Sequence, residues 1–227
     1  MAVKVKICGN TCYEDAALAL DLGADAVGFV FYEKSSRHIA PSTAAEIAKR
    51  LPPFAVKVGV FVNEFDLAVV RSIAEMCRLN IVQLHGGESP EYCARLADFT
   101  VVKALRVNDG FDPAHLRDFP VPAVLLDAYD ADTYGGTGRL FDWSKAVAAK
   151  QYARSLILAG GLTPENVALA IKMVKPYAVD VCSGVECKPG QKDKLLLRSF
   201  MLEVERTRGE IGHTGSLSGQ MTQWFEN

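Results

Sequence analysis

The amino-acid sequence predicts a single (β/α)8 barrel, or TIM barrel, of the α/β class, with a C-terminal extension. Short apolar runs alternate with amphipathic stretches along most of the chain, and there are eight such runs. The length of 227 residues also fits, because α/β barrels of about 200 to 250 residues form single domains. An open doubly wound sheet shows the same alternation, but the count of eight and the length favour the closed barrel.

The predicted strands are short and rich in Val, Ile and Phe, which is typical of parallel strands buried on both faces. They are Val3–Cys8, Ala26–Phe31, Ala55–Val62, Ile81–Leu84, Val101–Val107, Ala123–Asp127, Ser155–Ala159 and Ala178–Cys182.

Helical patterns fill the gaps between the strands, and several have recognisable start and stop signals. The first begins after Thr11 and stops at Gly23. Ser89-Pro90-Glu91 matches an N-cap followed by proline at the first helical position, and Thr163-Pro164-Glu165 repeats the device. The predicted helices are Tyr13–Leu22, Ser42–Leu51, Glu64–Cys77, Ser89–Ala97, Asp142–Lys150, 164–174 and Lys192–Arg206, with the weakest helical pattern at Asp112–Arg117.

The pattern contains no internal domain boundary before Arg208. After that residue the composition changes to Gly, Ser, Thr and Gln. We therefore expect the barrel to occupy residues 1–208 and residues 209–227 to form a flexible tail.

Composition argues against several classes of partner. The formal net charge is -2, so neither a nucleic acid nor an anionic membrane is expected as a partner. The chain has no run of apolar residues long enough for a membrane span, and its first residues lack the apolar core of a signal peptide. None of the six cysteines forms a C-x-x-C pair. We expect a cytoplasmic protein without a metal site, either a monomer or a weak homo-oligomer.

Barrel enzymes place their active sites at the C-terminal ends of the strands. The residues predicted at those ends are unusually polar and glycine-rich. They are Cys8, Phe31, Asn63, Gln83 with His85, Arg106, Asp127, Gly160 with Gly161, and Ser183 with Gly184.

The ends of the last two strands indicate a phosphate site. Gly160-Gly161 and Ser183-Gly184 follow neighbouring strands. Glycines let an anion approach backbone N–H groups closely, and the loops after strands seven and eight are the usual phosphate position in barrels. Tight turns alone would also explain the glycines, but two such loops on adjacent strands favour phosphate.

Asp127 follows three aliphatic residues and is either a helix cap or a functional acid. The segment after it contains Gly135-Gly136-Thr137-Gly138 and does not resemble an immediate helix start, which favours the functional role with a mobile loop over the site. Cys8, taken alone, is better explained as core. Arg37 in a loop is ordinarily solvated, unless an anionic substrate contacts it. For His85 a ligand contact and a satisfied strand-end residue are equally good explanations.

These residues resemble the phosphoribosylanthranilate isomerase family, the barrel isomerases of tryptophan biosynthesis. The similarity spans about residues 3 to 200, and its most specific parts are Lys6-Ile7-Cys8-Gly9 and Ser183-Gly184-Val185-Glu186. The other matching stretches are Gly23–Phe29, Ser36-Arg37, Val58–Asn63, Val82–Gly86, Leu126-Asp127 with Gly135–Gly138, Phe141–Trp143, Leu158–Leu162, Val179–Ser183, Pro189-Gly190 and Lys192-Asp193.

The resemblance implies an Amadori rearrangement of N-(5'-phosphoribosyl)anthranilate, without a metal or organic cofactor. It implies that Cys8 is the base and Asp127 the acid. Arg37, Gln83, His85 and Asp180 are implied as substrate contacts, and Gly160, Gly161, Ser183 and Gly184 as the phosphate site. Cys182 departs from the expected pattern, which has a small residue such as Ser there, and the chain after residue 208 has no recognisable counterpart.

Two other functions fit part of this pattern. The phosphate loops also suit another phosphosugar barrel, such as the indole-releasing tryptophan synthase subunit or a pentose-phosphate epimerase. An epimerase would need metal-binding His and Asp residues at several strand ends, and only His85 is suitably placed. A phosphate-ligand sensor without catalysis is the third possibility. The combination of Cys8 with Asp127 favours the isomerase. Whether the histidine-pathway aminoaldose is also a substrate stays open.

Overall fold

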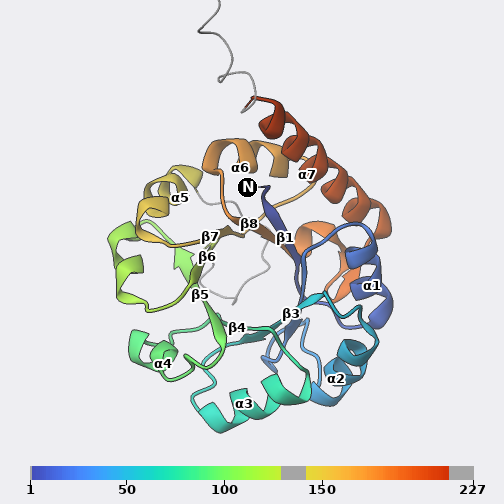
Figure 1. The fold of residues 1–227 in the computed structure, drawn as a ribbon, viewed down its shortest axis with the longest axis vertical. Coiled ribbons are helices and arrows are strands. Elements are labelled where there is room, and N and C mark those ends of the chain that lie inside the picture. Colours follow the sequence, from blue (N-terminus) through green and yellow to red (C-terminus); the bar gives the residue numbers. More distant parts are fainter. Residues whose placement is uncertain (1, 129–141, 215–227) are drawn as a thin grey trace, which may run out of the picture.

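The chain folds into a closed barrel of eight parallel strands surrounded by helices (Figure 1). A computed structural model describes residues 2–128 and 142–214. Each strand pairs with the next along the chain, and β8 pairs with β1 to close the barrel. The predicted (β/α)8 architecture is therefore confirmed. The glycine-rich segment expected above the site lies outside the described residues.

All eight strands agree with the prediction to within one residue at each end. They are β1 (Lys4–Ile7), β2 (Ala26–Val30), β3 (Val56–Phe61), β4 (Ile81–Leu84), β5 (Thr100–Val107), β6 (Ala123–Ala128), β7 (Leu156–Leu158) and β8 (Ala178–Val181). After β8 the chain forms a short two-stranded ribbon of β9 (Glu186–Lys188) and β10 (Gln191–Lys192) that sequence patterns did not predict.

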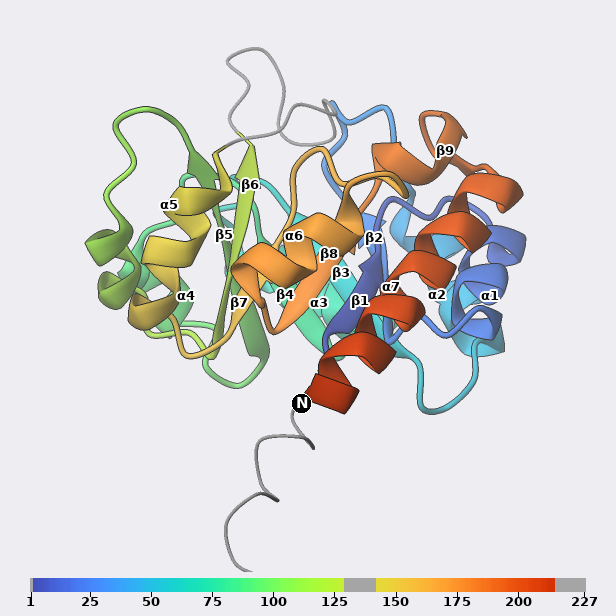
Figure 2. The same ribbon diagram turned by 90° about the horizontal axis from the view of Figure 1, so that it is seen from above.

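The helices lie outside the barrel, as Figures 1 and 2 show. They are α1 (Tyr13–Asp21), α2 (Pro41–Arg50), α3 (Leu67–Met76), α4 (Pro90–Ala94), α5 (Trp143–Ala149), α6 (Val167–Val174) and α7 (Lys194–Thr214). Three short 3-10 helices join them, η1 (Pro113–Asp118), η2 (Lys150–Tyr152) and η3 (Ser183–Val185). The weakest predicted helical pattern, after β5, is thus a 3-10 helix.

The starts of α4 and α6 differ in how they agree with the prediction. The Ser89 hydroxyl accepts a hydrogen bond from the Tyr92 N–H, which confirms the predicted cap of α4. The predicted start of α6 at residue 164 is wrong. There the Asn166 amide accepts from the Thr163 N–H and donates to the Gly161 carbonyl, so the segment forms a turn and the helix begins at Val167.

The C-terminal helix continues past residue 208, where the composition changes. The Arg208 guanidinium donates to the Val3 carbonyl and pairs with Asp25 at 3.1 Å, so this residue is docked against the barrel. Further along, Glu210 pairs with Lys172 of α6 at 2.7 Å. These contacts explain why α7 reaches Thr214 although the composition suggested a tail from 209 onward.

Alternation along the strands separates an inner from an outer apolar layer. Leu125 belongs to the cluster inside the barrel, whereas Leu126 packs in the larger cluster between strands and helices. Because side chains in a strand alternate between faces, Asp127 returns to the inner face at the end of β6. The same alternation places Lys6 and Cys8 inside, on either side of the outward-facing Ile7.

Within the described part of the chain, no helix has the length and apolarity that crossing a membrane requires.

Candidate active site

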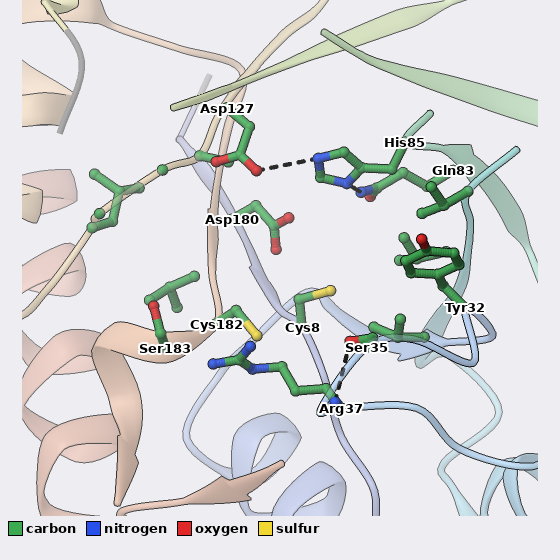
Figure 3. Close-up of a pocket in the computed structure, with 18 residues that line it drawn as sticks. Cys8, Tyr32, Ser35, Arg37, Gln83, His85, Asp127, Asp180, Cys182 and Ser183 are labelled. Atoms are coloured by element: carbon green, nitrogen blue, oxygen red, sulfur yellow. Dashed lines mark hydrogen bonds and ion pairs between the residues drawn. The ribbon is translucent and has the colours of Figure 1, made fainter. Parts of the chain in front are cut away.

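One pocket at the C-terminal end of the barrel collects nearly all the residues predicted for the site (Figure 3). Its lining includes Cys8, Arg37, Gln83, His85, Asp127, Gly160, Gly161, Asp180 and Ser183. Gly184 is the one predicted site residue that does not line this pocket. Residues from six different strand ends or following loops thus meet in one place, although they are far apart in the sequence.

Cys8 follows the last residue of β1 and is buried in the pocket wall. Its N–H donates to the Val181 carbonyl of β8, which extends the ladder between the two strands. A Cβ atom added at Gly28 of β2 would lie only 2.8 Å from the Cys8 Sγ. Glycine at position 28 therefore makes the space that the sulfur occupies.

A buried ion pair lies beneath the thiol. Lys6 Nζ is 2.7 Å from Asp180 Oδ2, and both side chains are less than a tenth exposed. Burial by itself lowers the pKa of Lys6, but the neighbouring Asp180 and Cys8 together raise it above its ordinary value. Burial raises the pKa of Asp180 to about 7, against the opposing effect of Lys6. Lys6 therefore stays a cation next to the Cys8 sulfur.

The environment of Cys8 favours its thiolate form. A hydrogen bond with Cys182 lowers the pKa of the Cys8 thiol most strongly, burial opposes this, and Lys6 and Lys192 lower it further. The net direction is well below the ordinary value. Conversely, the same hydrogen bond and burial raise the pKa of Cys182. Of the two thiols, Cys8 is therefore the one that ionises more readily.

This assignment predicts the pH dependence of alkylation. A lowered pKa means that the Cys8 thiolate persists as pH falls from 8.5 to neutrality, so iodoacetamide should modify Cys8 readily at pH 7. Cys93 is the internal comparison, because burial raises its pKa to about 11. Mass spectrometry of peptides after brief labelling measures both rates. A Cys8 rate that falls tenfold for each pH unit below about 8.5, as for an ordinary thiol, would contradict the assignment.

Opposite the thiol, a series of hydrogen-bonded polar side chains connects β4 with β6. Gln83 Nε2 lies 3.0 Å from His85 Nδ1, and His85 Nε2 lies 3.1 Å from Asp127 Oδ2. Because the Gln83 amide nitrogen can only donate, His85 accepts at Nδ1 and donates its Nε2–H to Asp127. Gln83 thereby selects the histidine tautomer, and His85 fixes the orientation of the Asp127 carboxyl group.

Arg37 reaches the pocket from the loop after β2 and is held by Glu186. The guanidinium Nε and Nη2 donate to the Glu186 carboxylate at 2.9 Å and 2.7 Å, and Lys192 Nζ lies 2.9 Å from the same carboxylate. Burial raises the pKa of Glu186, but Arg37 and Lys192 lower it by more than burial raises it. The pKa of this carboxyl group therefore lies below its ordinary value, and the carboxylate is ionised. Glu186 therefore occupies the edge of the Arg37 guanidinium that carries Nε and Nη2. A ligand carboxylate would contact the outer end of the guanidinium.

The loops after β7 and β8 form the remaining wall. Gly160 and Gly161 have φ angles of 83° and 65°, which lie in the left-handed region that favours glycine. A Cβ atom added at Gly184 would lie 1.9 Å from the Leu162 carbonyl oxygen. Gly184 therefore lets the second loop pack directly against the first, which explains its place outside the pocket lining.

Replacing Gly184 by Ala should destabilise the fold by about 1 to 3 kcal/mol, because the added methyl group displaces backbone rather than a flexible side chain. Chemical denaturation measures this change. Gly110→Ala is the matched control, since a Cβ atom there meets nothing closer than 3.7 Å. Equal stability of the two variants would show that the loops are not packed as described.

Sequence patterns missed three charged residues of the site: Lys6, Glu186 and Lys192. Lys6 was detectable in principle, because residues two apart on a strand share a face and Cys8 was already assigned to the pocket. Glu186 and Lys192 belong to the β9–β10 ribbon, and only the fold brings them to Arg37. In the described ranges, no group of three or more His, Cys, Asp or Glu is placed to hold a metal ion.

Comparison with known proteins identifies the family of the chain. The model of the N-(5'phosphoribosyl)anthranilate (PRA) isomerase family matches residues 5–203. The chain belongs to this family. The isomerase of Geobacter sp. (strain M21) is 53% identical over 203 residues, which cover 89% of this chain and 98% of that protein. The family prediction from the sequence is thus confirmed.

Solved structures of the PRA isomerase family have the same fold. The Thermotoga maritima enzyme is 45% identical with a TM-score of 0.82, and the match covers 90% of this chain and 99% of that one. Another structure, with a TM-score of 0.80, 44% identity and the same coverage, contains reduced 1-(o-carboxyphenylamino)-1-deoxyribulose 5-phosphate. Neither the indole-releasing synthase subunit nor a pentose-phosphate epimerase is the family that the comparisons give for this chain.

Proposed function

We propose that this chain converts N-(5'-phosphoribosyl)anthranilate to 1-(2-carboxyphenylamino)-1-deoxyribulose 5-phosphate, with Cys8 as base and Asp127 as acid. The observation that carries the proposal is the placement of these two groups in one pocket that also contains Arg37 and the glycine loops (Figure 3). Membership of the PRA isomerase family supports the same reaction.

The rearrangement needs two proton transfers of opposite kind. An acid protonates the ring oxygen of the ribose, the bond from that oxygen to C1 breaks, and an iminium ion forms between C1 and the aromatic nitrogen. A base then removes the C2 proton, and the electron pair moves into the iminium to give an enolamine. This intermediate becomes the ketone when a proton is added at C1 and the hydroxyl group on C2 loses its proton. The iminium accepts the electrons, so the substrate supplies its own electron sink.

Cys8 is suited to the second step. Cys182 and the nearby cation of Lys6 lower the pKa of the Cys8 thiol, which favours the thiolate. Asp180 keeps Lys6 in place and lines the same pocket, where its carboxyl group is available to a ribose hydroxyl. A thiolate that is already formed can accept the C2 proton without an additional base.

Asp127 is suited to the first step. His85 donates to Oδ2 and so orients the carboxyl group that would give a proton to the ribose ring oxygen. The hydrogen bonds from Gln83 to His85 and from His85 to Asp127 keep the carboxyl group oriented during this transfer.

The two anionic ends of the substrate would be anchored separately. Backbone N–H groups of the loops at Gly160-Gly161 and Ser183 would bind the phosphate, since left-handed glycines allow close approach to the chain. Gly184 supports this site by packing the loops together. The outer end of the Arg37 guanidinium would bind the anthranilate carboxylate, while Glu186 holds the inner edge.

Replacing Arg37 by Ala should therefore raise KM by at least about tenfold and change kcat much less, because a charge-assisted contact contributes about 1.5 to 3 kcal/mol to binding. Steady-state kinetics separate the two parameters. Arg37→Lys is the matched control, which keeps the charge but not the fork and should recover part of the loss. An unchanged KM in Arg37→Ala would exclude the carboxylate contact.

The function itself is tested by following the loss of substrate fluorescence with the purified protein. We expect saturable turnover of N-(5'-phosphoribosyl)anthranilate that inorganic phosphate inhibits competitively. Binding without turnover would instead favour a phosphate-ligand sensor. The histidine-pathway aminoaldose should be a poor substrate, because it carries two phosphates and the described residues of the pocket include one pair of glycine loops.

A further inference from the structure

Two cysteine side chains lie next to each other in the wall of the pocket. The register of β1 and β8 pairs Lys6 with Asp180 and Ile7 with Val181, so Cys8 and Cys182 follow as the next opposing residues. The hydrogen bond from the Cys8 N–H to the Val181 carbonyl, at 2.9 Å, shows that the ladder continues to this point. Figure 3 shows both sulfur atoms facing the pocket.

The separation of these residues suits a covalent bond between their sulfur atoms. Neighbouring strands lie about 4.8 Å apart, within the range of about 4.4 to 6.8 Å for the Cα atoms of a disulfide. The two side chains are close enough for each to shift the pKa of the other, and the Cys182 Sγ also lies 3.7 Å from the Glu186 carboxylate. A Cβ atom added at Gly9 would lie 2.8 Å from the Cys182 Sγ, so this sulfur atom lies beside Gly9, the residue that follows Cys8.

We propose that Cys8 and Cys182 form a site of reversible oxidation, at which a hydroperoxide converts the two thiols into an intramolecular disulfide. The effect of this bond on activity rests on the proposed function, because the disulfide would remove the base from the reaction. The site depends on cysteine at position 182, where the family resemblance predicts a residue such as Ser.

The reaction balances in two steps. The Cys8 thiolate attacks one oxygen of the hydroperoxide, so an S–O bond forms, the O–O bond breaks, and the sulfur becomes a sulfenic acid. The alkoxide or hydroxide that leaves takes a proton from solvent water to give an alcohol or water. The Cys182 sulfur then attacks the Cys8 sulfur, the S–O bond breaks, and the departing hydroxide takes the Cys182 proton to give water. Two thiols lose two electrons in total, and the hydroperoxide gains them. A dithiol reverses the change by exchange.

The other cysteines lack one part or another of this arrangement. Cys77 and Cys93 are buried away from the pocket, and burial raises the pKa of each thiol to about 11, so they are poor nucleophiles. Cys12 and Cys187 do not line the pocket. Cys8 combines a lowered pKa, access from the pocket and a neighbouring thiol, the three features of a redox-sensitive cysteine.

The test uses the full chain with Cys12→Ser and Cys187→Ser, so that the tryptic peptides carrying Cys8 and Cys182 contain no second cysteine. We expect stoichiometric hydrogen peroxide to yield one cross-linked peptide pair, lighter than the two free peptides by two hydrogen atoms. Activity should fall by about 100-fold, the contribution of a general base, and dithiothreitol should restore both readouts. Inorganic phosphate or substrate in the pocket should slow the reaction.

The matched control adds Cys182→Ser to the same protein, with activity after peroxide compared with its own untreated sample. It should form no cross-linked pair, and Cys8 should pass instead to acids that dithiothreitol does not fully reverse. Peroxide that leaves both thiols free, or takes Cys8 to sulfinic acid while Cys182 stays free, would overturn the proposal. A cross-link that forms without loss of activity supports the oxidation site and contradicts the role of Cys8 as base, so the two failures are distinguishable.

Discussion

Replacing Asp127 by Asn should lower kcat by at least about 100-fold while the substrate still binds, because general acid catalysis contributes about 10² to 10⁴ in rate. The amide keeps the size of the side chain and an oxygen that can accept the His85 N–H, but it has no proton to give to the ribose ring oxygen. The loss therefore falls on ring opening. Steady-state kinetics with the anthranilate substrate measure kcat and KM separately.

Asp142→Asn is the matched control for this prediction. Asp142 caps α5 outside the pocket by accepting from the Ser144 N–H, and Asn caps a helix equally well. This variant should turn over at nearly the rate of the unmodified protein. Near-normal kcat in Asp127→Asn would remove Asp127 from the acid role, whereas an equal loss in both variants would indicate a general effect on folding.

Replacing Cys8 by Ser should lower kcat by a similar factor of at least about 100. The hydroxyl group fits the space above Gly28, but a serine hydroxyl does not ionise near neutral pH, so no base remains at the end of β1. Because the phosphate loops and Arg37 are unchanged, binding should persist. Isothermal titration with the substrate and a rate assay on the same sample test the two statements.

Cys187→Ser is the control for this substitution, since Cys187 is exposed and lies outside the pocket lining. The lowered pKa of Cys8 adds a second readout. In the unmodified protein, activity should fall with decreasing pH only as pH approaches that lowered value, because the base is lost when the thiolate is protonated. Activity of Cys8→Ser within about tenfold of the unmodified protein would contradict the base assignment.

The barrel was predictable because its strands are buried on both faces. A short apolar run such as Ile81–Leu84 is typical of a strand buried on both faces, and its bounds agree with those of β4. The ends of helices were less predictable, since they depend on contacts that only the fold supplies. Arg208 illustrates this: its bonds to Val3 and Asp25 continue α7 through a region whose composition suggested a tail.

The site was predictable to the extent that strand ends converge. Cys8 and Asp127 are far apart in the sequence, and the barrel rule alone brings them to one rim. The electrostatic environment was not predictable, because Lys6, Glu186 and Lys192 act through partners that lie on other elements. The proximity of Cys182 to Cys8 depends likewise on the closure of β8 onto β1.

The central claim is that Cys8 and Asp127 act on one ribose unit anchored at both of its anionic ends. A crystal structure of this protein with reduced 1-(o-carboxyphenylamino)-1-deoxyribulose 5-phosphate tests it most directly. We predict the Cys8 Sγ within about 3.5 Å of C2, with the Asp127 carboxyl group beside the former ring oxygen and the phosphate between the Gly160 and Ser183 loops. A ligand whose ribose carbons lie beyond the reach of either side chain would contradict the account.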